Sequence, residues 1–100
     1  MSTRDKIETL LSENKIVLFM KGQPEAPQCG FSARAIAILA ELGAEYTSIN
    51  VLDDPEIREG IKEYGQWPTI PQLYVNKELI GGSDIMMEMF ETGELKDAIK

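Results

Sequence analysis

The stretch Ile16-Val17-Leu18-Phe19-Met20 is the longest continuous run of large apolar side chains in the chain. A run without alternation predicts a strand that is buried on both faces, at the centre of a parallel or mixed sheet. A loop broken by glycine and proline follows at 21–28, and then a helical pattern over 30–42 that Gly43 ends. Residues 45–51 predict a second strand. Together these segments predict a βαβ unit with parallel strands and a right-handed crossover.

The helix predicted over 30–42 has one apolar face, which we expect to pack on the sheet. Five residues form this face: Phe31, Ala35, Ile38, Leu39 and Leu42.

Helical patterns also precede and follow the βαβ unit. Residues 3–13 predict a first helix, for which Ser2 or Thr3 can serve as the cap. Asp53-Asp54-Pro55 opens a further helix, which we expect to run to about Tyr64 and to end at Gly65.

The last third of the chain predicts a hairpin and two short helices. Residues 67–71 cannot be helical because two prolines lie three residues apart. Gln72 to Val75 and Leu79-Ile80 predict a hairpin around Asn76-Lys77. Ser83-Asp84 is predicted to cap the next helix, and a short final helix carries Leu95, Ala98 and Ile99. The fold class is therefore α/β: a four-stranded mixed sheet flanked by helices on both faces, in a single domain spanning 1–100.

Composition excludes several classes of function. The 100 residues hold 17 acidic and 10 basic side chains, a net charge of −7, which argues against binding to nucleic acid or to an anionic membrane surface. One cysteine cannot form a disulfide within the chain, which suits a reducing compartment. Because the N-terminal residues contain no apolar signal run and the chain contains no segment of membrane-spanning length, we expect a cytoplasmic protein.

The single cysteine, Cys29, lies where the loop gives way to a helix. The positive end of a helix dipole favours the thiolate form, and Lys21 at the end of the central strand can add to that effect. The alternative for Cys29 is a small buried side chain without a chemical role, and the alternative for Lys21 is a solvated lysine at the end of a strand. The chain has no histidine, which excludes a Cys–His nucleophile, and no Cys-x-x-Cys pair that could begin a metal site.

Four motifs, in order, resemble the monothiol (CGFS-type) glutaredoxin family. They are Lys21-Gly22, Pro27-Gln28-Cys29-Gly30-Phe31-Ser32, Trp67-Pro68-Thr69-Ile70-Pro71-Gln72 and Gly81-Gly82-Ser83-Asp84. The resemblance covers essentially the whole chain and implies a thioredoxin fold. Many family members carry a second cysteine at the position of Ser83, so a disulfide between that position and Cys29 is excluded here.

The resemblance makes Cys29 the catalytic thiol and a ligand of an iron–sulfur cluster. Dithiol relatives have a second cysteine where this chain has Ser32, so Cys29 needs glutathione to resolve a mixed disulfide. A [2Fe-2S] cluster takes four ligands, and one chain offers a single thiolate. The family pattern implies a homodimer bridged by the cluster, with Cys29 and one glutathione from each chain.

The resemblance also implies that Ile70, Ser83 and Asp84 bind glutathione. Ile70 precedes the family's cis-proline position and would pair its backbone with the tripeptide, whereas a trans Pro71 starting an edge strand is the alternative. Backbone N–H groups of Ser83 and Asp84 would hold the γ-glutamyl carboxylate, and the Asp84 side chain would hold the ammonium group. Without the resemblance, Asp84 is simply a helix cap.

Arg58 and Lys62 lie four residues apart on one predicted helix face. The resemblance implies that Arg58 and Lys62 bind the glycyl carboxylate of glutathione. With Lys21 they would form a small basic patch on an acidic protein. Glu59 and Glu63 flank them, so a solvated helix face is the alternative.

Three functions follow as hypotheses. The first is a carrier that passes [2Fe-2S] clusters to apo iron–sulfur proteins and acts in iron and redox homeostasis. The second is a glutathione-dependent thiol–disulfide oxidoreductase, or deglutathionylase, with Cys29 as the nucleophile. The third is a regulatory adaptor that shares the cluster with a BolA-like partner.

Overall fold

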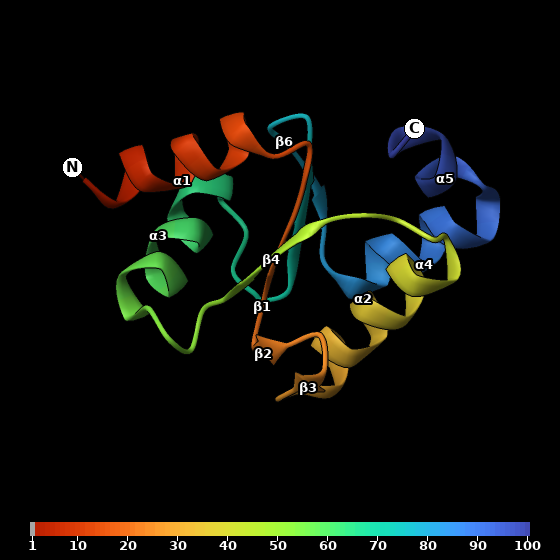
Figure 1. Ribbon diagram of the computed structural model, residues 1–100, viewed down its shortest axis with the longest axis horizontal. Helices are drawn as coiled ribbons and strands as arrows, with labels where there is room; N and C mark the ends of the chain where they lie inside the picture. The colour runs from red at the N-terminus through yellow and green to blue at the C-terminus, as the bar shows by residue number, and fades with distance from the viewer. Residues whose placement is uncertain (1) are drawn as a thin grey trace.

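A four-stranded mixed sheet forms the centre of the computed structural model, which describes residues 2–100 (Figure 1). The strands lie in the order β4 (Thr47–Asn50), β1 (Ile16–Met20), β5 (Gln72–Val75) and β6 (Glu78–Gly81). β1 runs parallel to β4 and antiparallel to β5, which pairs in turn with β6. The predicted mixed sheet and βαβ unit are therefore confirmed.

Helices cover both faces of this sheet, as predicted. One face carries α1 (Thr3–Glu13) and α3 (Pro55–Gly65), and the other carries α2 (Gly30–Glu41), α4 (Ser83–Thr92) and α5 (Glu94–Ala98) (Figure 1). All five residues of β1 are buried. Ile16, Leu18 and Met20 belong to the core under α2 and α4, whereas Val17 and Phe19 belong to the core under α1 and α3. β1 is apolar throughout because it supplies both cores.

The helix starts mostly follow the predicted caps. The Ser2 hydroxyl accepts from the Asp5 N–H, and the Asp5 carboxylate accepts from the Ser2 N–H, which is a capping box. The Asp54 carboxylate accepts from the N–H groups of Glu56 and Ile57 at the start of α3. The prediction for α4 was wrong: Gly82 is the N-cap residue and no side chain caps this helix, so Ser83 is its first residue.

Two helix ends show how the chain leaves each helix. Gly43, at φ +65°, ends α2 as predicted. Gly65 is the last residue of α3, but the left-handed conformation that follows the helix falls on Gln66, at φ 49°, and not on the glycine. In the hairpin, Asn76 and Lys77 both have positive φ, as the predicted two-residue turn between β5 and β6 requires.

Residues 21–28 are more regular than a loop. β2 (Gly22–Gln23) and β3 (Ala26–Pro27) form a short antiparallel ribbon. The side-chain oxygen of Asn50 accepts from the Gly22 N–H at 2.9 Å, which ties the ribbon to the end of β4. The ribbon returns the chain from the end of β1 to the start of α2.

Phe31 does not join the buried face of α2, contrary to the prediction. It is 57% exposed, whereas Ala35, Ile38 and Leu39 on the same face are buried. Phe31 lies in the first turn of α2 and borders a cavity described below, so its ring faces an open space and not the sheet. Among residues 2–100, no helix combines the length and the apolar character needed to cross a membrane.

Candidate functional site

Cys29 is the N-cap residue of α2, and its sulfur lies in a set of hydrogen bonds. The Ser32 N–H donates to Sγ at 3.3 Å, and the hydroxyl oxygen of Ser32 lies 3.2 Å from the same sulfur. Ser32 is fully buried, and its oxygen also accepts from the Lys21 N–H at 3.1 Å. The half-buried thiol is thus held in one orientation at the start of a helix.

These surroundings change the ionisation of the thiol. Partial burial raises the pKa of Cys29, but hydrogen bonds from the Ser32 side chain and from the backbone N–H groups of Ser32 and Phe31 lower it. The positive charge of Lys21 lowers it further, and the net result is a pKa below the ordinary value for a thiol. Cys29 is therefore suited to react, or to bind a metal, as a thiolate.

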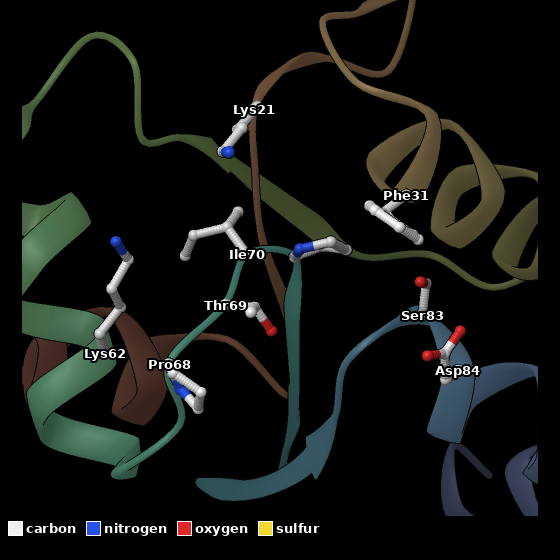
Figure 2. A pocket seen from close by; sticks show the side chains of 9 residues that line it. Lys21, Phe31, Lys62, Pro68, Thr69, Ile70, Ser83 and Asp84 are labelled. Atoms are coloured by element: carbon white, nitrogen blue, oxygen red, sulfur yellow. The ribbon is translucent and has the colours of Figure 1, made fainter.

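A cavity of about 340 Å³ opens near this thiol, with Lys21 and Phe31 among the residues that line it (Figure 2). Five of the residues predicted for the site line it: Lys21, Lys62, Ile70, Ser83 and Asp84. They come from three regions of the chain, namely the end of β1, helix α3 with the loop before β5, and the start of α4. Pro71 lines the cavity as well, and the Ile70–Pro71 peptide bond is cis.

The two sides of the cavity carry different groups. Figure 2 shows Lys62 on the α3 side and Ser83 with Asp84 on the α4 side, with Ile70 between them. Ser83 and Asp84 occupy the first turn of α4, where backbone N–H groups lack partners within the helix. The cavity therefore offers the Lys62 ammonium group at one end and the N-terminus of a helix at the other, and both favour anionic groups.

Ile70 provides the floor between these ends. It immediately precedes Pro71 and lies two residues before the first residue of β5, so its backbone is outside the ladder between β5 and β1. An extended peptide in the cavity can pair with backbone groups at this position.

Arg58 and Cys29 are not among the residues that line the cavity. Arg58 lies on α3 one turn before Lys62, and its Nε is buried without a hydrogen-bond partner within residues 2–100. Cys29 lies two residues before Phe31, which does line the cavity. Lys21 and Phe31, which both act on the Cys29 thiol, line the cavity, so the thiol lies near it; of Arg58 and Lys62, only Lys62 lines it.

Sequence reasoning missed some features of the site. Phe31, Pro68 and Thr69 line the cavity, but they were not predicted as site residues. Arg34 on α2 lies 3.5 Å from the Asp84 carboxylate, an exposed ion pair between α2 and α4 that no sequence pattern indicated. Phe31 and Thr69 belong to the motifs that contain Cys29 and Ile70. Their nearness to these two residues in the sequence was the signal that could have identified them as site residues.

Comparison with known proteins decides the family. A family model described as glutaredoxin matches residues 16–80. The ycf64-like monothiol glutaredoxin of Synechocystis sp. is 51% identical over 98 residues, which cover 98% of this chain and 92% of that protein. This chain belongs to the monothiol glutaredoxin family.

Solved structures of glutaredoxins share the same fold. The solution structure of reduced poplar apo GrxS14 has a TM-score of 0.82 at 44% identity and covers 94% of this chain and 86% of that one. The buckwheat glutaredoxin–glutathione complex has a TM-score of 0.86 at 25% identity over 97% and 86% of the two chains. The predicted thioredoxin-like α/β fold is confirmed.

As a monothiol glutaredoxin, the chain offers one thiol to its chemistry. Residues 2–100 contain no cluster of three or more histidine, cysteine or acidic side chains that could hold a metal ion. A metal centre at Cys29 therefore needs ligands from other molecules, and a redox cycle at Cys29 needs a second thiol from outside.

Proposed function

We propose that this monothiol glutaredoxin binds glutathione in the cavity beside Cys29 and carries a [2Fe-2S] cluster as its cargo between two chains. The observation that carries the proposal is the convergence of Lys21, Lys62 and the α4 N-terminus on one cavity next to a thiol of lowered pKa. A net charge of −7 makes this local concentration of groups that favour anions selective for a small anionic ligand.

Glutathione fits the groups of the cavity in type and order. Its glycyl carboxylate would meet Lys62, with Arg58 on the same helix face. Its backbone would pair with Ile70, and its γ-glutamyl end would meet the N–H groups of α4 and the Asp84 carboxylate. In this proposed arrangement the cysteinyl thiol of glutathione would face Cys29.

The ligand count supports a dimer. A [2Fe-2S] cluster takes four ligands, and each chain with one glutathione supplies two thiolates. Two chains therefore complete the set, and apo iron–sulfur proteins or a BolA-like partner would be the recipients or co-holders of the cluster. We place this role in iron and redox homeostasis. Because a low-pKa thiolate without a second cysteine suits a reducing compartment, we propose a cytoplasmic location.

Anaerobic reconstitution with iron, sulfide and glutathione tests the proposal. The wild type should develop a visible cluster absorption and shift from monomer to dimer in size-exclusion chromatography. Cys29→Ser should do neither. If Cys29→Ser retains the chromophore, or if wild type forms the cluster equally well without glutathione, the proposed ligand set is wrong.

The lowered pKa of Cys29 supports a second function, that of a glutathione-dependent oxidoreductase. In this reaction the Cys29 thiolate attacks a glutathionylated substrate, and the substrate thiolate leaves. Glutathione then attacks the mixed disulfide, which releases glutathione disulfide and restores Cys29. A wild type that stays colourless and monomeric after reconstitution, yet rapidly deglutathionylates a model disulfide, would favour this function.

A further inference from the structure

Gln72 is a buried polar side chain next to Phe19 and Tyr74 of the apolar core. It is the first residue of β5, lies opposite Phe19 of β1 and is fully buried. Its side-chain N–H groups donate to the carbonyl oxygens of Trp67 at 3.0 Å and Thr69 at 3.2 Å. A buried amide is costly unless its hydrogen bonds are made, and here both donors hold the loop that runs along the cavity.

Tyr74 completes this set of hydrogen bonds. Its hydroxyl donates to the side-chain oxygen of Gln72 at 3.0 Å, and the residue is 2% exposed. The accepted bond fixes which end of the Gln72 amide faces the loop, because the oxygen faces Tyr74 and the nitrogen is left to face the two carbonyls. The Tyr74 ring packs edge-on against Phe19 with centroids 5.6 Å apart, and this contact holds the ring that carries the hydroxyl in place.

The same hydroxyl also lies against α3. A Cβ atom at Gly65, in the last turn of α3, would collide with the Tyr74 hydroxyl oxygen and would come within 3.2 Å of the Gln72 side-chain oxygen. The Trp67 N–H donates to the Lys62 carbonyl at 3.0 Å, which joins α3 to the loop a second time. Helix α3 and residues 67–71 are therefore held as one unit.

This unit carries one whole side of the cavity. Lys62 belongs to α3, and Pro68, Thr69 and Ile70 belong to the loop, and all four line the cavity. Neither Gln72 nor Tyr74 lines it. We propose that Gln72 and Tyr74 are positioning residues that hold the 67–71 loop against α3 and so set the distance between the Ile70 backbone and the Lys62 ammonium for glutathione. This inference rests on the proposed glutathione site.

The test uses Tyr74→Phe, which removes one hydroxyl and keeps the ring, and Gln72→Met, which keeps the length of the side chain without its polar atoms. Thr47→Val is the matched control, because it removes one hydrogen bond, from the Thr47 hydroxyl to Asn14 at 2.9 Å, on the edge strand β4, two strands away from β5. Two quantities are measured: the Kd for glutathione, and the hydrogen-exchange rate of the Trp67 amide in the ligand-free protein.

We expect Tyr74→Phe to weaken glutathione binding about three- to tenfold and to speed Trp67 exchange by a similar factor. Gln72→Met should have the larger effect, whereas Thr47→Val should change neither quantity by more than about twofold. Unchanged Kd and unchanged exchange in Tyr74→Phe would overturn the proposal. An equal loss of affinity in Thr47→Val would also overturn it, because general destabilisation would then explain the result.

The exchange measurement separates this inference from the proposed function. If wild type does not bind glutathione, the proposed function is wrong, and Trp67 exchange alone then decides the positioning role. Faster exchange in Tyr74→Phe supports that role, and wild-type exchange rejects it. Trp67 is the single tryptophan of the chain, so its fluorescence gives a second reading of the loop.

Discussion

The hydroxyl oxygen of Ser32 lies 3.2 Å from the sulfur of Cys29 and accepts a hydrogen bond from the Lys21 N–H. Because the backbone occupies the acceptor side of this oxygen, its hydrogen is free to donate to the sulfur once the thiol ionises. Dithiol glutaredoxins have their second cysteine at this position. In this chain the same position supports a thiolate and cannot resolve a disulfide.

Replacing Ser32 by alanine should raise the pKa of Cys29, because the side-chain hydrogen bond of Ser32 is the largest influence that lowers it. We expect the rate of alkylation by iodoacetamide, followed against pH, to rise at a higher pH in Ser32→Ala than in wild type. Ser12→Ala, on the exposed surface of α1, is the control and should match wild type. An unchanged pH profile in Ser32→Ala would mean that the hydroxyl does not stabilise the thiolate.

Lys62 should matter more than Arg58 for glutathione binding, because Lys62 lines the cavity and Arg58 does not. We expect Lys62→Gln to weaken binding about three- to tenfold at low salt, by the loss of one charge-assisted contact. Arg58→Gln should weaken it less, and Lys77→Gln, in the exposed hairpin turn, should have no effect. Isothermal titration at two salt concentrations measures this order. A larger loss for Arg58→Gln would show that the ligand lies closer to the start of α3.

Ionisation of Tyr74 should reduce the stability of the protein at high pH. Burial, with a smaller effect from Tyr64, raises the pKa of Tyr74 to about 12, whereas an unfolded tyrosine ionises near ~10. The neutral folded form is thus favoured below pH ~10, and the unfolding free energy should fall as pH rises from about 10 to 12. Urea unfolding across this range should show a smaller decline for Tyr74→Phe. If the unfolding free energies of wild type and Tyr74→Phe decline in parallel with pH, the loss of stability does not come from the raised pKa of Tyr74.

Gly65→Ala should destabilise the protein by about 1–3 kcal/mol, because the new methyl group meets the Tyr74 hydroxyl in a packed core. Gly30→Ala is the matched substitution. It also lies in a helix, but a Cβ atom there meets nothing within 4 Å, so we expect no loss and a gain of up to about 1 kcal/mol. Urea unfolding of both variants measures the difference. Equal stabilities would mean that α3 can move away from Tyr74 without cost.

The sequence predicted the elements that follow from regular patterns. The apolar run of β1, the Asp54-Pro55 start of α3 and the Asn76-Lys77 turn are local signals, and each belongs to one kind of structure. The grouping of Lys21, Ile70 and Asp84 came from the family motifs, and they do line one cavity. Their roles toward glutathione stay predictions.

Other features depend on contacts that no local pattern contains. Phe31 fits the helical stripe but is exposed and lines the cavity, so the helical period alone misplaced it. The β2–β3 ribbon is tied to Asn50, which is 28 residues away from Gly22. The sequence pattern predicts only that Gln72 is a strand residue. Its amide can donate to the Trp67 and Thr69 carbonyl oxygens only because residues 67–71 bend back over it. The only signal in the sequence for this role of Gln72 was a polar residue at the start of an otherwise apolar strand.

The stoichiometry of the reconstituted protein tests the central claim most directly. Native mass spectrometry after anaerobic reconstitution should show one dominant species with two chains, one [2Fe-2S] cluster and two glutathione molecules, and Cys29→Ser should give the bare monomer. A cluster-bound species without glutathione, or a cluster held by a single chain, would contradict the claim that Cys29 and glutathione together complete the ligand set.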